Sequence, residues 1–265
     1  IQDRMSWGTS SRTFGSSTLT NSAGKSLPNT DAATYLPLVG DFDGDGFADI
    51  FWHAPGAGVD LQWYGRADRK FDQKDVQVAG TYTRRLTGDF DGDGKSDVFW
   101  YLQGGTSYVT FGSSARTATA TRAVTAGGAG VPSAAFTPLV GDFDGDGRSD
   151  IYFYAPGAVA DVQWFGRADR KFDITKDATN AEYRPFVGDF DGDARDDIFW
   201  YGLNAQVDKI SWGASARNFP TVSAPSVSSD YLPLVADFDG NSASDIYFYK
   251  STHIVERVLY GLVKP

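Results

Sequence analysis

One acidic motif of nine residues occurs five times in this sequence and constrains the fold more than any other feature. Its copies are DFDGDGFAD (41–49), DFDGDGKSD (89–97), DFDGDGRSD (142–150), DFDGDARDD (189–197) and DFDGNSASD (237–245). They follow one another at intervals of about 50 residues, which is longer than most helical solenoid repeats. The segments between them show no helical periodicity, so the sequence predicts an array of short strands.

The segments around the motif are repeated as well. A short apolar run such as Leu36–Val39 precedes the motif, and an aromatic run such as Val98–Tyr101 follows it. After a Gly-rich turn comes a segment that ends in an aromatic residue and glycine, at Trp7-Gly8, Tyr64-Gly65, Phe111-Gly112, Phe165-Gly166, Trp212-Gly213 and Tyr260-Gly261. Four residues after the glycine stands an arginine in all but the last, namely Arg12, Arg69, Arg116, Arg170 and Arg217. Such runs favour buried strands, so we expect four antiparallel strands per repeat, with the arginine on the fourth.

The sequence therefore predicts an all-β fold, a β-propeller of four-stranded blades. We expect a single domain over residues 1–265, with repeats that start near residues 35, 82, 136, 183 and 231. Residues 1–34 would complete the last blade, so that strands exchanged between the N- and C-termini close a five-bladed ring. One aromatic–Gly segment is left over in this scheme, and a fragment of a larger ring is the alternative.

The motif has the spacing of a calcium loop. Carboxylates at positions one, three, five and nine, with a backbone carbonyl at position seven, form an oxygen-only cage that suits Ca²⁺ better than zinc or copper. The predicted ligands are Asp41, Asp43, Asp45, Phe47 and Asp49; Asp89, Asp91, Asp93, Lys95 and Asp97; Asp142, Asp144, Asp146, Arg148 and Asp150; Asp189, Asp191, Asp193, Arg195 and Asp197; Asp237, Asp239, Asn241, Ala243 and Asp245. Five Ca²⁺ ions would balance the formal net charge of -10.

Two loops depart from the pattern. Ala194 replaces the glycine at position six, where a left-handed backbone would cost about 1 kcal/mol or more. In the fifth loop Asn241 replaces a carboxylate and Ser242 replaces the glycine. We expect this fifth site to be the weakest.

EF-hands and dockerin-type modules also use DxDGDG, but both need helices beside the loop, and here aromatic strands follow instead. Asp-Gly turns without metal are the alternative. The motif followed by an aromatic strand resembles the FG-GAP or VCBS repeat family, whose members resemble integrin α-subunit propellers and some secreted lectins. This resemblance implies a propeller with Ca²⁺ in a loop between the first two strands of each blade.

The sequence offers little for catalysis. Its only histidines are His53 and His253, and no HExxH, GxSxG or phosphate-binding glycine motif occurs. His53 occupies the position of a tyrosine in other repeats, which favours a structural role. A polysaccharide-active enzyme would have to use carboxylates outside the loops, such as Asp60 or Asp161. The assignment as an enzyme therefore stays open, with a non-catalytic role favoured.

Binding of a glycan is the favoured function. Residues 54–72 and 155–173 match at 15 of 19 positions and both combine a tryptophan with arginines. An aromatic plate with charged groups beside it is typical of sugar sites, so the predicted ligand-binding residues are Trp63, Arg66, Arg69, Trp164, Arg167 and Arg170. The alternatives are that these tryptophans are core residues, or that the chain is a protein-interaction or scaffold module.

The sequence also indicates which classes of partner are not expected and where the protein is located. No basic run points to nucleic acid, and no apolar run approaches the roughly 20 residues that cross a bilayer, so we expect neither nucleic acid binding nor membrane insertion. Loops of this kind fill at the millimolar Ca²⁺ found outside cells. We therefore expect a secreted, extracellular protein.

Overall fold

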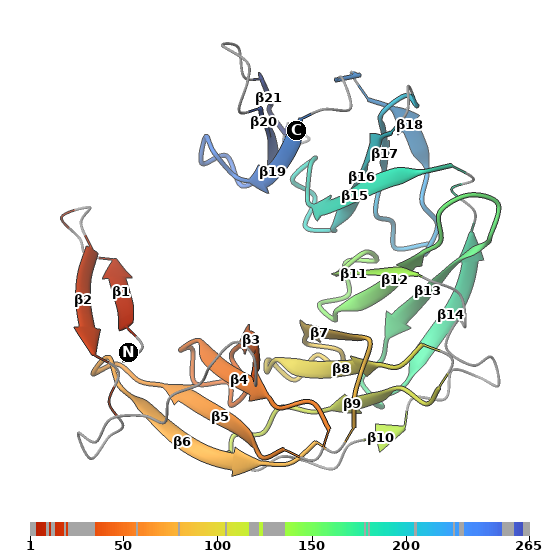
Figure 1. Ribbon diagram of the computed structural model, residues 1–265. Helices are drawn as coiled ribbons and strands as arrows, with labels where there is room; N and C mark the ends of the chain where they lie inside the picture. The colour runs from red at the N-terminus through yellow and green to blue at the C-terminus, as the bar shows by residue number, and fades with distance from the viewer. Residues whose placement is uncertain are drawn as a thin grey trace. The chain divides into compact units, whose positions relative to one another are not determined.

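The structure is a computed structural model. It describes residues 4–8, 11, 14–18, 20, 35–56, 58–78, 80–103, 105–116, 122–123, 136–177, 179, 181–203, 206–224, 226–227, 231–250 and 257–261. Every regular element among these residues is a β-strand, as the sequence predicted (Figure 1). In this described part of the chain, no helix is long and apolar enough to cross a membrane. The described chain divides into two compact units, and the expectation of a single domain stays a prediction.

Unit 1 comprises residues 1–89 and 93–125 and contains three antiparallel sheets among its described residues. A two-stranded sheet pairs β1 (Arg4–Gly8) with β2 (Phe14–Thr18). The first four-stranded sheet contains β3 (Leu36–Gly40), β4 (Asp49–His53), β5 (Asp60–Gly65) and β6 (Phe71–Val76). The second contains β7 (Arg84–Gly88), β8 (Asp97–Tyr101), β9 (Tyr108–Thr110) and β10 (Arg122–Ala123).

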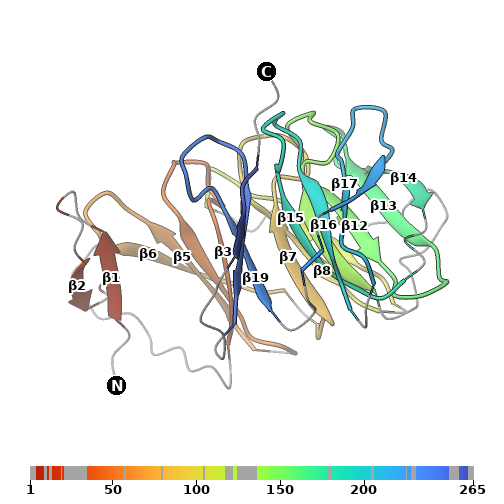
Figure 2. The same cartoon turned by 90° about the horizontal axis from the view of Figure 1, so that it is seen from above.

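Unit 2 comprises residues 90–92 and 126–265. Its first sheet contains β11 (Thr137–Gly141), β12 (Asp150–Tyr154), β13 (Asp161–Gly166) and β14 (Phe172–Asp177). Its second contains β15 (Tyr183–Gly188), β16 (Asp197–Gly202), β17 (Lys209–Ser211) and β18 (Thr221–Ser223). The described part of the last sheet has three strands, β19 (Leu232–Ala236), β20 (Asp245–Tyr249) and β21 (Arg257–Leu259). Figure 2 shows neighbours such as β15 and β16 side by side in a second view.

Strand pairing places the acidic motif at the same position in each sheet. The last residue of the first strand pairs with the ninth residue of the motif, as Gly40 pairs with Asp49 and Gly188 with Asp197. The motif therefore forms the loop of the hairpin between strands one and two. Every copy lies at the corresponding end of its sheet.

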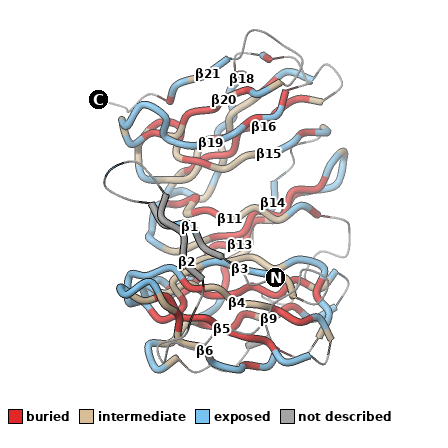
Figure 3. The backbone as a smooth tube through the Cα atoms, turned by 60° about the vertical axis from the view of Figure 1, so that its left-hand side comes forward, coloured by how far each residue is buried: buried red, intermediate tan, exposed pale blue. Residues whose placement is uncertain are grey.

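The aromatic strands form the core. Every residue of β8, β12 and β16 is buried, which confirms the prediction from their β-branched and aromatic composition. Figure 3 shows β5 and β13 with long buried stretches as well. In unit 2, β15 contacts both β11 and β19, so the sheet β15–β18 lies between two others and both faces of β16 are covered.

The turn after the aromatic–Gly segment corrects one expectation. Arg69, Arg116, Arg170 and Arg217 lie before the fourth strand, in a turn, and each has a positive φ between 52° and 64°. The arginines are therefore turn residues and not strand residues. Arg12 lies outside the described residues.

The predicted strand exchange between the two ends of the chain concerns β1, β2 and the sheet β19–β21. Among the described residues, the first of these sheets has two strands and the last has three. The five-bladed closure stays a prediction.

Candidate metal centres

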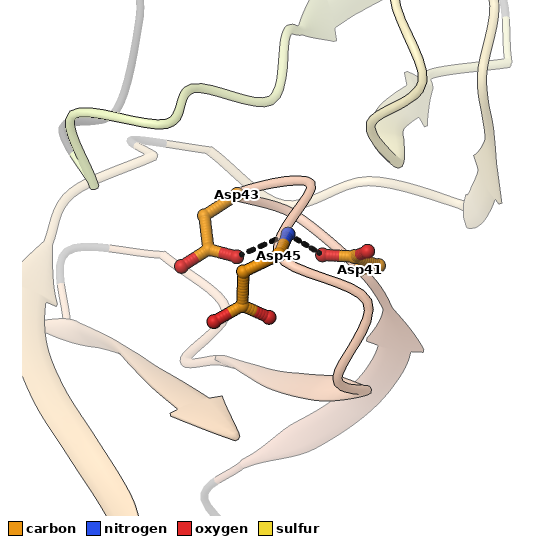
Figure 4. Close-up of side chains that lie close together, drawn as sticks. All are labelled: Asp41, Asp43 and Asp45. Carbon is orange, nitrogen blue, oxygen red and sulfur yellow. Dashed lines mark hydrogen bonds between the residues drawn. The ribbon is translucent and has the colours of Figure 1, made fainter. Parts of the chain in front are cut away.

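The first motif loop is held in shape by its own carboxylates. Asp41 Oδ1 accepts hydrogen bonds from the amides of Gly44 at 2.8 Å and Asp45 at 3.2 Å, and its Oδ2 accepts one from Gly46 at 2.8 Å. The amide of Asp45 also donates to Asp43 Oδ1 at 3.2 Å, as Figure 4 shows. These bonds wrap the backbone around the carboxylate at position one. As a result, the side chains of Asp41, Asp43 and Asp45 converge.

Convergence occurs in all five loops. In each, three carboxylates offer oxygen atoms that all lie within 4.8 Å of one another. The five sets are Asp41, Asp43 and Asp45; Asp89, Asp91 and Asp97; Asp142, Asp144 and Asp146; Asp189, Asp191 and Asp197; and Asp237, Asp239 and Asp245. The structure therefore brings together side chains that the sequence predicted as ligands in every loop.

The aspartate at position nine of the motif also accepts hydrogen bonds from backbone amides outside its own position. In the third loop Asp150 accepts the amide of Phe143 at 3.0 Å on Oδ2 and the amide of Gly166 at 2.8 Å on Oδ1. The equivalent carboxylates Asp49, Asp197 and Asp245 accept the same two bonds in their loops. Each thus ties the loop to the aromatic–Gly strand. Any coordination by this carboxylate uses lone pairs that these amides leave free.

Burial makes these carboxylates costly to ionise without a cation. It raises the pKa of Asp49 to about 7, of Asp150 to about 8 and of Asp197 to about 7, although the backbone amides oppose the shift. Burial, followed by the nearby charge of Asp144, also raises the pKa of Asp146. A divalent cation would offset both effects.

Residues at position seven were predicted to supply carbonyl ligands. They are Phe47, Lys95, Arg148, Arg195 and Ala243, and in each the backbone amide donates to the side-chain oxygen at position five. This bond fixes the peptide direction in the loop. The role of their carbonyl oxygens stays a prediction.

The two irregular loops keep the same backbone. Ala194 has φ 65° and Ser242 has φ 72°, so both adopt the left-handed conformation that glycine adopts in the other loops. In the fifth loop Asn241 Oδ1 accepts the amide of Ala243 at 2.7 Å, as an aspartate does elsewhere. Asp237 and Asp239 are exposed, whereas Asp43 and Asp144 are 5% and 6% exposed. Greater exposure and one missing charge favour the expectation that the fifth site is the weakest.

Neighbouring loops are linked by the residue at position eight, which the sequence analysis did not single out. The amide of Ser96 donates to the Asp41 carbonyl at 2.7 Å, and Ser96 Oγ accepts the Asp41 amide at 3.0 Å. In unit 2, Asp196 makes the same two bonds with Asp142, each at 2.8 Å. The available sequence signal was the small polar residue at position eight of every motif copy except the first, which has Ala48 there.

The turn arginines also bind the loops. Arg116 donates from Nε to Asp43 at 2.5 Å and from its other nitrogens to Asp45 and Asp72. In unit 2, Arg217 donates to Asp144 and Asp173, each at 2.7 Å, and Arg170 donates to Asp91 at 2.7 Å. Each of these three arginines therefore contacts the carboxylate at position three of the preceding loop. Its repetition four residues after Gly was the available sequence signal.

The predicted sugar-binding tryptophans require a correction. Trp63 is 0% exposed and Trp164 is 1% exposed. Trp63 packs against Trp52 with ring centroids 5.1 Å apart, and Trp164 packs against Phe153 at 5.2 Å. An indole with no exposed face cannot stack on a sugar, so both are core residues, as the alternative held.

The predicted sugar-binding site also included four arginines. Arg66 and Arg167 are partly exposed and make ion pairs with Asp68 and Asp72, and with Asp169 and Asp173. Arg69 is exposed, and Arg170 belongs to the loop contact described above. The structure does not gather these arginines around an exposed aromatic plate.

Asp60 and Asp161 were the carboxylates considered for catalysis. Both are 0% exposed. Asp60 accepts hydrogen bonds from the amides of Ala54 at 2.7 Å and Val78 at 2.6 Å and contacts His53 Nδ1 at 2.9 Å. Asp161 binds the equivalent amides of Ala155 and Thr179. These carboxylates are buried and fasten the ends of strands.

The loops fit a hard divalent cation. Their donors are oxygen atoms, they converge within one short segment, and burial opposes a bare negative charge. Two family models match the chain, an FG-GAP repeat over residues 33–68 and an FG-GAP-like repeat over residues 60–153.

The chain carries FG-GAP repeats.

The matched FG-GAP segments include the first three motif loops. No curated protein matches the chain. Among solved structures, one similar chain is a lectin of Agrocybe aegerita, described with the structural basis of its specific recognition of non-reducing terminal N-acetylglucosamine. The TM-score is 0.66 at 18% identity, and the match covers 89% of this chain and 66% of the lectin chain. The chain thus spans just under two thirds of that lectin's length, and it has the β-propeller fold.

Proposed function

We propose that this FG-GAP protein is a calcium-binding β-propeller that acts as a carbohydrate-binding module outside the cell. The observation that supports calcium is the convergence of three carboxylates within 4.8 Å in each of five loops. The lectin among its structural neighbours supports carbohydrate binding.

Calcium would be held by the side-chain oxygens at positions one, three, five and nine of each loop, which are aspartates everywhere except at Asn241. The ion would neutralise carboxylates that burial makes costly to ionise, as the raised pKa of Asp150 indicates. The position-three carboxylates Asp43 and Asp144 would then bind the ion on one side and an arginine on the other. Calcium would in this way stabilise the contacts between sheets as well as each loop.

Carbohydrate binding is tested with a glycan array that includes glycans ending in non-reducing N-acetylglucosamine. The purified chain is applied in excess Ca²⁺ and, in parallel, with a chelator. We expect selective binding in Ca²⁺ that is lost or weakened when the ion is removed. A blank array from chain that is folded and loaded with Ca²⁺ would contradict the proposal.

An extracellular location rests on the same chemistry. Loops open to solvent bind Ca²⁺ readily at extracellular, millimolar concentrations. A dissociation constant in the nanomolar range, measured by titration calorimetry, would remove this argument for secretion.

A protein-interaction role is the second candidate, supported by one apolar surface in unit 1. Val39 is 60% exposed and Phe47 is 41% exposed, and with Phe71 they line a cavity of about 220 Å³. Exposed apolar surface of this kind is typical of interaction sites. Mutating Val39 and Phe47 to serine would weaken a protein contact and leave glycan binding unchanged.

A further inference from the structure

In the second, third and fourth loops, a cationic side chain at position seven of the motif contacts the carboxylate at position five. The three pairs are Lys95 with Asp93, Arg148 with Asp146, and Arg195 with Asp193. The lysine Nζ lies 3.1 Å from the carboxylate Oδ2, and each guanidinium donates from Nη2 to the same oxygen. The six side chains are 15% to 31% exposed, so water and salt screen these pairs only in part.

Each of these arginines engages both oxygens of its carboxylate. In the third loop Asp146 Oδ1 accepts the backbone amide of Arg148 at 3.0 Å, and Oδ2 accepts its guanidinium. Arg195 binds Asp193 in the same way. A Ca²⁺ ion in such a loop uses the side chain at position five as a ligand. The guanidinium and the ion are therefore two cations directed at one carboxylate.

The position-seven arginines are also anchored at a second point. Arg148 Nε donates to the carbonyl of Gly166 at 3.0 Å, and Arg195 is anchored in the same way. In the fifth loop an uncharged group fills this place, because Asn241 Nδ2 donates to the Gly261 carbonyl at 3.1 Å. A guanidinium that is already anchored loses little further freedom when it pairs with the carboxylate. Its ion pair therefore contributes more than one between two freely moving surface side chains.

The first and third loops offer a comparison within one chain. Both have aspartates at positions one, three, five and nine and glycines at positions four and six. In both, the turn arginine of the next sheet reaches Oδ2 at position five, from Arg116 at 3.2 Å and from Arg217 at 3.7 Å. At position seven, however, the first loop has Phe47 where the third has Arg148. The third loop therefore directs one more positive charge at its position-five carboxylate.

We propose that the position-seven cations Lys95, Arg148 and Arg195 compete with Ca²⁺ for the position-five carboxylate and thereby set the calcium affinity of their loops. This inference rests on the calcium binding proposed above and extends it. The affinity of a calcium loop depends on the charge of its ligands, and a cation held on one ligand repels the entering ion. The first loop, with Phe47, should therefore fill at a lower Ca²⁺ concentration than the third.

The test is a Ca²⁺ titration of the whole chain, followed by NMR at two glycine amides. Gly46 and Gly147 stand at position six, and their amides donate to the position-one carboxylates Asp41 and Asp142 at 2.8 and 2.9 Å. Each amide signal therefore reports an ion bound to its own loop. We expect Gly46 to reach half of its shift at a Ca²⁺ concentration about three- to tenfold lower than Gly147 does.

Exchanges at position seven test the competition directly. Arg148→Met removes the charge and keeps an unbranched side chain, so it should lower the half-saturation concentration at Gly147 about three- to tenfold and leave Gly46 unchanged. Arg148→Lys should keep the value of the unmodified chain to within about twofold, because Lys95 makes the same contact in the second loop. The reverse exchange, Phe47→Arg, should raise the half-saturation concentration at Gly46.

Lys176→Met is the matched control for net charge. Lys176 is an exposed residue of β14 outside the motif loops, so this exchange removes one positive charge without altering a position-five contact. It should leave both half-saturation concentrations unchanged. An unchanged value at Gly147 in Arg148→Met, or an equal gain in Lys176→Met, would overturn the competition.

The same titration separates this inference from calcium binding itself. Saturable shifts at both glycines that Arg148→Met does not alter would refute the competition and leave calcium binding in place. No saturable shift at either glycine, in a chain whose spectrum shows it to be folded, would refute both.

Discussion

Two glycines of the repeat are required for different physical reasons. At Gly147 the backbone has φ 82° and a Cβ would meet nothing within 4 Å, so glycine serves only to allow the left-handed turn. At Gly213 a Cβ would lie 2.4 Å from the carbonyl oxygen of Asp196 and 2.7 Å from that of Phe143. Glycine is needed there because two backbone carbonyls approach it closely.

Replacing each glycine by alanine should separate these effects. Gly147→Ala is expected to cost about 1 to 2 kcal/mol of unfolding free energy, because Ala194 already adopts this conformation in another loop. Gly213→Ala should cost about 3 kcal/mol, because backbone atoms cannot move aside as a side chain does. Urea unfolding in excess Ca²⁺ measures both. If Gly213→Ala costs no more than Gly147→Ala, the steric explanation is wrong.

At the scale of the sheets, contacts between neighbouring elements depend on the motif loops. The position-eight residue and the turn arginine of one sheet both bind the loop of the preceding sheet, as Asp196 and Arg217 do in unit 2. The loops thus serve as the points where sheets join. Loss of order in a loop should therefore weaken the packing of two sheets.

Removing one such contact should be costly. Arg217→Ala leaves Asp144, whose side chain is 4% exposed, without its guanidinium partner, and we expect a loss of about 2 to 3 kcal/mol. Arg167→Ala is the matched control. The side chain of Arg167 is 44% exposed, so its ion pairs should contribute at most about 1 kcal/mol to the free energy of unfolding. Thermal unfolding of both variants gives the comparison. Equal losses would contradict a special role for the contact between sheets.

Across the whole molecule, calcium would act on several loops at once. When the free Ca²⁺ concentration is about 100 times the dissociation constant of a site, that site adds about 2.7 kcal/mol to the free energy of unfolding. The contributions of independent sites add together. We therefore expect a chelator to lower the unfolding temperature strongly and Ca²⁺ to restore it. Mg²⁺ should restore little, because it demands a tighter octahedral shell. Identical unfolding curves in Ca²⁺ and chelator would contradict metal binding.

The sequence by itself determined the strand order within each repeat and the convergence of the motif carboxylates. Both are local properties, because the motif closes a hairpin and its amides fold back onto the aspartate at position one. Repetition of the pattern made the all-β blade predictable, and the aromatic runs correctly marked strands that are buried throughout in β8, β12 and β16 and mostly buried in β4 and β20, where Tyr249 is exposed. The left-handed backbone at Ala194 followed from its place in the motif in the same way.

Only the tertiary structure decided which aromatic and charged residues reach solvent. Trp63 was predicted to bind a ligand at the surface, but Trp63 and its neighbour Tyr64 are both buried, at 0% and 2% exposure. When both faces of a sheet are covered, the side chains on both faces are buried, so alternation of every second residue along the strand no longer distinguishes core residues from surface residues. The arginine contacts with Asp43 and Asp144 join residues more than 70 positions apart, and spacing along the chain could not reveal such pairs.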